Sequence, residues 1–190
     1  PYANSFEKAE VGEFPEKMME IDGTFKVVEL EDGAKALEMT PEPLTENAVL
    51  FGPSVKGGAT VRAKVRGYKK RRSYPRFAVG LHGISGYRLR VVPSKDEIEL
   101  VKNEEGVKAV PFDWRADEWV NLELSISAAG EKWKVEGRAW AVGTEKPKEP
   151  TISLQHEGSP GQGKGSIWGT AYSGKVMQFD DVEIVPEPEK

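Results

Sequence analysis

The segment Ala59-Thr60-Val61-Arg62-Ala63-Lys64-Val65-Arg66 decides the fold class. Apolar residues alternate with polar and basic ones along it, so that every second side chain is apolar. Successive side chains of a β-strand point to opposite faces of a sheet, so a period of two places one row in a core and the other in water. The segment therefore predicts a half-buried strand.

The rest of the chain repeats this pattern in short segments. No long amphipathic helix pattern stands out, and 20 glycines and 13 prolines leave little room for one. Segments that recur at a spacing of roughly 8–12 residues are typical of a β-sandwich or barrel. The further predicted strands are Phe25–Leu30, Lys35–Thr40, Ala48–Gly52, Arg76–His82, Tyr87–Val92, Glu97–Lys102, Val107–Phe112, Leu122–Ile126, Lys132–Val142, Thr151–His156, Gly165–Tyr172 and Val176–Val185.

Composition excludes several classes of function. The net charge of -4 gives no reason to expect long-range attraction to nucleic acid or to an anionic membrane. No apolar run approaches the roughly 20 residues that span a bilayer. The chain has no cysteine, which excludes disulfides and Cys-ligated zinc, and its two histidines cannot supply a three-histidine zinc site.

The chain length of 190 residues favours one core. Strand-like patterns open the chain at Phe6-Glu7 and close it at Phe179–Ile184, and we expect these two ends to neighbour each other. The run Pro186-Glu187-Pro188-Glu189-Lys190 is typical of a linker-like tail. The sequence therefore predicts one domain over residues 1–185 and a tail over residues 186–190.

Several short motifs together resemble a known family. They are Phe6-Glu7, Gly86–Leu89, Gly137–Trp140, Trp168–Gly174 and Phe179–Val182. The pattern resembles the concanavalin A-like lectin/glucanase superfamily, and more narrowly the jelly-roll domain at the C-terminus of secreted bacterial proteins with a quinoprotein-like β-propeller. The resemblance implies an all-β fold, a two-sheet antiparallel jelly-roll sandwich. It also implies an extracytoplasmic location, periplasmic or secreted, a carbohydrate ligand and a β-propeller neighbour.

One departure from this superfamily bears on catalysis. Its glucanases carry paired acids on one strand, written Glu-x-Asp-x-x-Glu or Glu-x-Asp-x-Glu, and this chain has no such motif. Glu97-Ile98-Glu99 is the nearest match and lacks the spacing. The departure lowers the expectation of a glucanase.

Seven side chains are candidates for a ligand-binding face. Sugars bind to aromatic rings that stack on C–H surfaces and to planar polar groups that bond pairs of hydroxyls. The alternation turns Trp168 and Tyr172 to one side of their strand, and Arg138 and Trp140 to one side of theirs. The alternative is that the tryptophans only cover the sheet, with arginines lying flat over them. The candidate set is Arg76, His82, Arg138, Trp140, Gln155, Trp168 and Tyr172.

A structural calcium ion is a second hypothesis. Calcium takes several oxygen ligands, mostly carboxylates and carbonyls. Asp180 and Asp181 near the last strand, with Glu7 near the N-terminus, are the candidate ligands. The alternative is that the two aspartates end a turn and cap nearby amides. Adjacent residues of a regular strand point to opposite faces, so only one of the two would bind easily.

Two further features have a structural alternative that we favour. The basic run Lys69–Arg72 between Tyr68 and Tyr74 resembles a nucleic-acid contact, but it lies between two strands of an acidic chain and is expected to be a solvated hairpin tip. His156-Glu157, with His82, could act as acid and base, but no motif places a nucleophile or a second acid beside them.

These observations predict a non-catalytic binding module for carbohydrate, part of a larger exported bacterial protein. One alternative is an enzyme that cleaves glycosidic bonds, of the glucanase or keto-disaccharide hydrolase type. Another is a structural domain that docks on a β-propeller.

Overall fold

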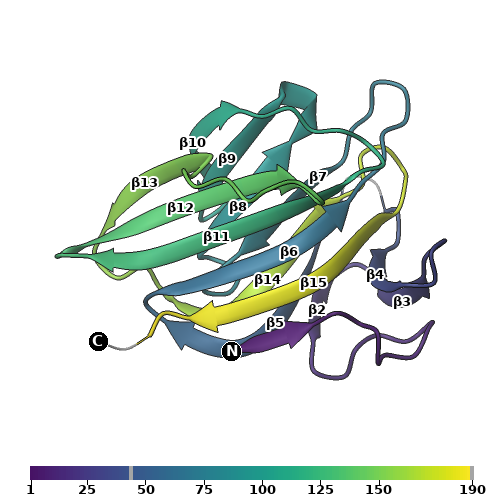
Figure 1. Cartoon of the computed structure of the whole chain (residues 1–190), viewed down its shortest axis with the longest axis horizontal. Helices are drawn as coiled ribbons and strands as arrows, with labels where there is room; N and C mark the ends of the chain where they lie inside the picture. Colours follow the sequence, from purple (N-terminus) through teal and green to yellow (C-terminus); the bar gives the residue numbers. More distant parts are fainter. Residues whose placement is uncertain (43–44, 189–190) are drawn as a thin grey trace.

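The computed structural model describes residues 1–42 and 45–188. In this part of the chain, the strands form two antiparallel sheets packed face to face (Figure 1). One short 3-10 helix (η1, Pro93–Lys95) connects β8 and β9. We name them the β6 sheet and the β7 sheet after a central strand of each. The predicted all-β sandwich is confirmed.

The β6 sheet has eight strands and carries both ends of the described chain. The short strand β1 (Tyr2–Asn4) pairs with β15, so the first strand does neighbour the last one. The strand predicted at Phe6-Glu7 is wrong, because these residues form a turn after β1 in which Phe6 has a positive φ of 62°. The remaining strands run in the order β13 (Ile152–Glu157), β12 (Lys132–Ala141), β11 (Trp119–Ala129), β6 (Ala59–Arg66), β15 (Met177–Pro186), β4 (Lys35–Met39) and β3 (Phe25–Glu29).

The β7 sheet has seven strands. They run in the order β10 (Glu105–Pro111), β9 (Glu97–Lys102), β8 (Tyr87–Val92), β7 (Arg76–Gly80), β14 (Gln162–Thr170), β5 (Glu46–Lys56) and β2 (Met19–Asp22). Sequence alternation does not predict β1 or β2. All four residues of β2 are exposed, so β2 shows no contrast between a wet and a buried face.

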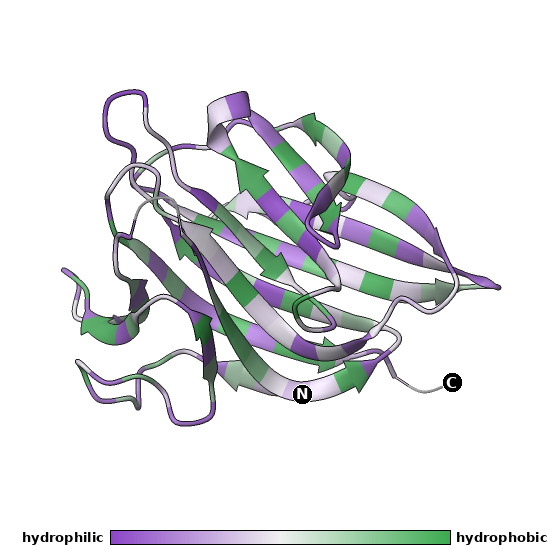
Figure 2. Cartoon of the chain, turned by 180° about the vertical axis from the view of Figure 1, so that it is seen from behind, coloured by the Kyte–Doolittle hydropathy of each residue, from purple (hydrophilic) through white to green (hydrophobic). Residues whose placement is uncertain are grey.

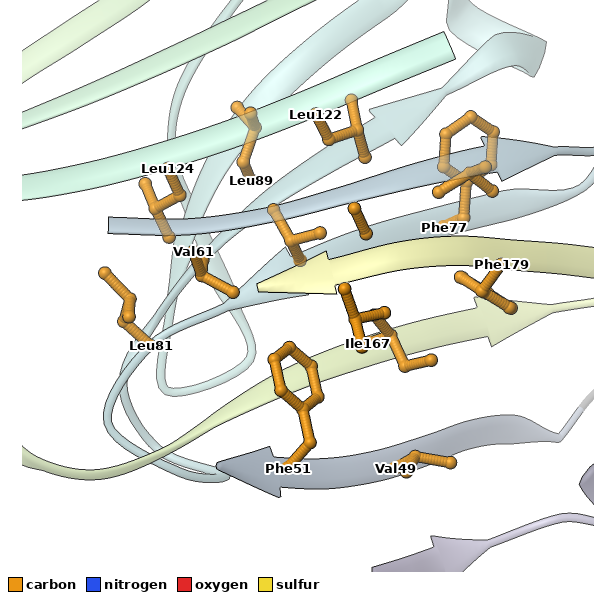
Figure 3. Packing of buried hydrophobic residues seen from close by; sticks show 14 of the residues in the cluster. Val49, Phe51, Val61, Phe77, Leu81, Leu89, Leu122, Leu124, Ile167 and Phe179 are labelled. Carbon is orange, nitrogen blue, oxygen red and sulfur yellow. The ribbon is translucent and has the colours of Figure 1, made fainter. Parts of the chain in front are cut away.

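The core lies between the sheets and follows from the alternation. Val61, Ala63 and Val65 of β6 are almost fully buried, whereas the alternate residues of this strand face outward. Figure 3 shows Val61 and Leu124 of the β6 sheet close to Leu89 of the β7 sheet in one shared cluster. Burying one such side chain contributes about 1.5–3 kcal/mol. Figure 2 shows the resulting stripes of apolar and polar residues along the strands.

The chain passes from the β6 sheet to the β7 sheet through residues 67–75. This loop contains the basic run, and it closes as a tight hairpin in which Lys70 and Ser73 exchange two backbone hydrogen bonds of 3.0 and 2.9 Å. Arg71 at the tip has a positive φ of 56°. The hairpin predicted for Lys69–Arg72 is confirmed.

The predicted tail is partly incorporated into the sheet. Pro186 is the last residue of β15, and the Glu187 amide donates to the Gly58 carbonyl over 2.9 Å. Residues 189–190 lie outside the described part of the chain. Among the described residues, the structure has no helix long and apolar enough to cross a membrane.

Candidate functional site

The outer face of the β7 sheet carries a row of polar residues beside small ones. On β7, Arg76, Ala78 and Gly80 point outward, and the alternate residues Phe77 and Val79 enter the core. Strand β14 lies alongside and pairs Thr170 with Arg76, Trp168 with Ala78 and Ser166 with Gly80. The alternation thus brings Arg76 and Trp168 to one face, as predicted.

Arg88 of β8 covers Trp168 on this face. Its guanidinium carbon lies 3.4 Å from the centre of the Trp168 ring. The residues of β7 between the two strands on this face, Ala78 and Gly80, are small, so the long side chain of Arg88 can lie flat across them. A Cβ at position 80 would clash with Ser166 Oγ and would come within 3.3 Å of Arg88 Cγ. Only 5% of Trp168 remains exposed, so its ring is not available for stacking on a sugar.

Carboxylates hold two of the arginines on this face. Arg88 donates from Nη1 to Glu46 Oε1 over 3.0 Å and from Nη2 to the Ile84 carbonyl over 3.1 Å. Arg90 donates from Nε to Glu99 Oε1 over 2.6 Å. Burial lowers the pKa of Arg88, and Glu46 acts in the opposite direction. An arginine stays charged in proteins, so Arg88 is a fixed cation in the floor of the face.

Above these groups lies a shallow hollow of about 320 Å³, which we call the arginine pocket. It contains three guanidinium groups, two carboxylates, one hydroxyl and one phenol ring. Tyr172, which follows β14, is 42% exposed, and the Arg76 guanidinium lies 5.6 Å from its ring centre. The lining residues are Glu46, Arg76, Arg88, Arg90, Glu104, Thr170 and Tyr172.

Two buried polar atoms of the arginine pocket have no hydrogen-bond partner among the described residues, Arg76 Nε and Thr170 Oγ1. Thr170 is only 2% exposed. The nearest charged partner of Arg76 is Glu46, whose Oε2 lies 3.9 Å from Arg76 Nη2. Buried polar groups in proteins are nearly always bonded, so these two neighbouring unbonded atoms distinguish this pocket.

The other sheet carries three of the predicted binding residues. Arg138 and Trp140 of β12 and Gln155 of β13 belong to the β6 sheet, and Arg138 and Trp140 point to its outer face. The single face expected from the alternation is therefore wrong. A period of two shows which residues of one strand share a side, but it does not show to which sheet the strand belongs.

Arg138 and Trp140 lie beside a charge network. Glu123, 3% exposed, accepts hydrogen bonds from Arg62 Nε over 2.5 Å and from Lys146 Nζ over 2.8 Å, and Arg138 lies 3.9 Å away. Burial would raise the pKa of Glu123, but the hydrogen bonds from Lys146 and Arg62 outweigh it and lower the pKa. Lys146 also lies 6.0 Å from the centre of the Trp140 ring.

His82 lies at the far end of β7, away from Arg76. The predicted strand Arg76–His82 stops at Gly80, and His82 has a positive φ of 61°. Its ring is buried, with Nε2 2.7 Å from the Gly57 carbonyl oxygen, and burial lowers its pKa. The prediction of His82 in the binding face is wrong, because the strand ends before the alternation reaches it.

Glu7, Asp180 and Asp181 are the predicted calcium ligands, and the described structure has no group of three or more His, Cys, Asp or Glu side chains that could hold a metal ion. Glu7 accepts from the Lys35 amide, and Asp181 Oδ2 pairs with Lys64 Nζ at 2.6 Å. Asp180 Oδ1 accepts from the Asp181 amide over 2.8 Å. Glu7 and Asp181 lie close enough to Asp180 for their charges to raise its pKa, but each of the three carboxylates has a protein partner, and the calcium site stays a prediction.

His156 does not form an acid–base pair with a carboxylate. Its Nδ1 lies 2.8 Å from the Tyr87 hydroxyl, and its Nε2 lies 3.1 Å from the Ser159 carbonyl oxygen. Burial raises the pKa of Tyr87, which keeps that hydroxyl protonated. Both ring nitrogens thus hold the turn after β13 in place.

The main residues missed by sequence reasoning are Glu46, Arg88 and Glu104. Glu46 precedes the predicted start of its strand at Ala48, whereas β5 begins at Glu46 itself. Arg88 alternates outward with Arg90, a signal that was available, but its stacking on Trp168 is not visible in the sequence. Glu104 belongs to a two-residue turn, and only the order of strands brings it to the pocket.

No family model and no curated protein sequence matches the chain. Its structure is similar to the carbohydrate-binding module CBM66 from Bacillus subtilis, with TM-score 0.60 and 13% identity over 88% of this chain and 94% of that one. The lectin UEA-II complexed with galactose gives TM-score 0.55 and 10% identity over 97% of both chains. The catalytic domain of a glycoside hydrolase family 131 protein from Coprinopsis cinerea gives 0.61 and 11%, over 97% of this chain and 93% of that one.

At these identities the likenesses show the fold. The chain is a two-sheet antiparallel jelly-roll sandwich of the concanavalin A-like type. The predicted fold class is confirmed.

Proposed function

We propose that this domain binds carbohydrate through the arginine pocket and does not act on it chemically. The observation that carries the proposal is the pair of buried, unbonded polar atoms, Arg76 Nε and Thr170 Oγ1, in one pocket. Structural neighbours described as a carbohydrate-binding module and as a lectin with galactose support it.

The chemistry of the pocket suits a sugar. Guanidinium and carboxylate groups bond pairs of hydroxyls through planar forks, and Glu46, Arg76 and Glu104 line the pocket together. Tyr172 offers the exposed ring on which C–H groups can stack. In this proposal Trp168 supports the floor of the pocket and Tyr172 contacts the ligand.

The proposal is tested by titrating the domain with a panel of oligosaccharides in a calorimeter. Loss of a hydrogen bond to a charged group costs about 1.5–3 kcal/mol, so Arg76→Gln should weaken binding about 10- to 100-fold. Tyr172→Ala should weaken it as well. Trp140→Ala, on the opposite sheet, is the control and should bind like the native domain.

Two results would contradict the proposal. One is a domain that binds no member of the panel. The other is binding that Trp140→Ala abolishes and Arg76→Gln leaves unchanged.

Cleavage of a glycosidic bond is a second candidate function. Glu46 and Glu104 line one pocket, and a catalytic domain of glycoside hydrolase family 131 has the same fold. Hydrolysis needs two carboxyl groups in different protonation states across the bond. Release of reducing ends from the same panel, lost in Glu104→Gln, would favour this candidate over plain binding.

The cellular setting is part of the proposal. We infer from the sequence resemblance that the domain belongs to a larger exported bacterial protein and lies outside the cytoplasm beside a β-propeller. Locating the full-length parent chain by cell fractionation tests this, and a parent found in the cytoplasm would contradict it.

A further inference from the structure

We propose that the arginine pocket selects acidic glycans, and that Arg76 and Thr170 together hold a carboxylate or sulfate group of the sugar. The inference rests on the proposed function, because it names the class of carbohydrate that the same pocket takes. Four features of the structure lead to it.

The first feature is an arginine with open hydrogen-bond donors. Glu46 holds Arg88 by a hydrogen bond of 3.0 Å, and Glu99 holds Arg90 by one of 2.6 Å. Arg76 forms a long ion pair with Glu46, 3.9 Å from Nη2 to Oε2, and its Nε has no hydrogen-bond partner among the described residues. A planar guanidinium with open donors binds a carboxylate or sulfate more strongly than it binds a neutral hydroxyl.

The second feature is the hydroxyl beside that charge. Thr170 pairs directly with Arg76 across β14 and β7, so the two side chains share a face. Its Oγ1 is buried and without a partner among the described residues. A hydroxyl can donate to one oxygen of an anionic group while the guanidinium donates to the other. Both atoms are covered in the structure, so in this proposal the two side chains turn toward the pocket when an anion binds and donate to its oxygens.

The third feature is the basic hairpin, Lys69–Arg72. All four residues are exposed, and none makes an ion pair in the described structure. Only three residues separate Arg72 from Arg76, so the extended chain can place them at most about 14 Å apart. The loop after β14, which carries Tyr172, starts beside the strand that follows this hairpin, because Thr170 at the end of β14 pairs with Arg76 at the start of β7. The hairpin thus extends the positive charge beyond the pocket, toward further anionic groups of a glycan chain.

The fourth feature is the position of the acids. Arg88 binds Glu46. Glu104 lies in the turn after β9, whereas Arg76 lies near the start of β9. The acids near the base of the hairpin, Glu31 and Asp117, act on Arg66 and Tyr68 on the side of the β6 sheet. Glu46 thus lies beside Thr170 and Arg76 with its charge shared by Arg88 and Arg76, whereas Glu104 lies at the other end and offers acceptors for sugar hydroxyls.

The experiment measures the affinity of the domain for four probes. They are a neutral glucan oligomer, an oligouronate, a sulfated oligosaccharide and a single-stranded oligonucleotide of matched charge. We expect the oligouronate, the sulfated probe or both to bind at least about 10-fold more tightly than the neutral oligomer. The comparison of these two acidic probes identifies whether carboxylate or sulfate is preferred.

Thr170→Val is the sharpest variant. It removes a buried hydroxyl that has no partner, so the thermal stability of the domain should not fall. Affinity for the preferred acidic probe should fall about 3- to 10-fold, whereas affinity for the neutral oligomer should change little. Unchanged affinity for the acidic probe would overturn the role of Thr170 and with it the proposed anion site.

The hairpin is tested by Arg71→Gln with Arg72→Gln. Exposed charges act mainly on the association rate and its salt dependence, so this double variant should bind the acidic probe more slowly at low salt. The control is Lys132→Gln with Lys134→Gln, which changes the net charge equally at the far end of the sandwich and should not slow binding.

The outcomes separate this inference from the proposed function. Binding of the neutral oligomer as tightly as the acidic probes would overturn the inference and leave carbohydrate binding intact. Binding of no glycan would overturn both. Binding of the oligonucleotide as tightly as the acidic glycans would also overturn the inference, because the hairpin would then act as a general polyanion contact.

Discussion

Arg88 is the residue on which the architecture of the site depends. It is 1% exposed, it lies flat on Trp168, and it links that ring to Glu46. A buried guanidinium is stable only when its donors are bonded and its face is packed, and this environment supplies both. The sequence pattern predicts Trp168 on an outward face, and Arg88 is the reason that the ring is nevertheless covered.

Replacing Arg88 by alanine should destabilise the domain and uncover Trp168. The variant leaves Glu46 without its closest cation and leaves a void over the ring, so we expect a loss of about 2–4 kcal/mol in the free energy of unfolding. Denaturant unfolding measures the loss, and a red shift of tryptophan emission reports the exposure of Trp168. The control is Arg115→Ala, since the Arg115 side chain is 72% exposed and should change little. Native stability and unshifted emission in Arg88→Ala would contradict the role given to Arg88.

Strand β15 shows how one irregular residue changes the chemistry of an element. Its pairing with β6 shifts between Asp180 and Glu183, and Asp181 has a positive φ of 45°. A bulge of this kind resets the alternation, so that Phe179 and Val182 both enter the core. Asp180 pairs with Lys64, and Asp181 forms an ion pair with the same lysine. The prediction that the two aspartates point to opposite faces is wrong for this reason.

The bulge predicts a pH dependence of stability. Burial raises the pKa of the Asp180 carboxyl from its usual 3.8 to about 7. Between pH 3.8 and about pH 7, Asp180 holds a proton in the folded chain that it has lost in the unfolded chain. The native domain therefore loses stability as the pH rises through this range. Asp180→Asn keeps the acceptor for the Asp181 amide and should be more stable than the native domain at pH 8 by about 1–2 kcal/mol, allowing for the water that reaches this half-buried group.

Unfolding titrations at pH 5 and pH 8 measure this difference. The control is Asp181→Asn, which loses the ion pair with Lys64 and should show no gain at pH 8. A gain for Asp180→Asn that is the same at both pH values would contradict the titration of Asp180.

At the scale of the whole molecule, the sequence predicts the sandwich well and its binding face only in part. The strands of the core are found because alternation encodes burial directly, as in Ala59–Arg66. Arg76, Trp168 and Tyr172 come together because neighbouring strands carry them in register. Trp140 is placed wrongly because membership of one sheet or the other depends on strand order, which no local pattern encodes.

The jelly roll itself does not determine a function, since lectins and hydrolases share this architecture. What the domain binds therefore depends on the side chains of a particular face, here the outer face of the β7 sheet. Its pocket combines open polar atoms, an exposed ring and a rigid floor, whereas the charged groups around Glu123 on the opposite face bond to one another.

An NMR titration shows directly whether a glycan occupies the arginine pocket. We predict that adding the preferred oligosaccharide to the isotope-labelled domain shifts the backbone signals of Arg76, Thr170 and Tyr172 and the indole signal of Trp168. The indole signal of Trp140 should stay in place. Shifts confined to Trp140 and its neighbours on the β6 sheet, or no shifts with any glycan, would contradict the predicted occupancy.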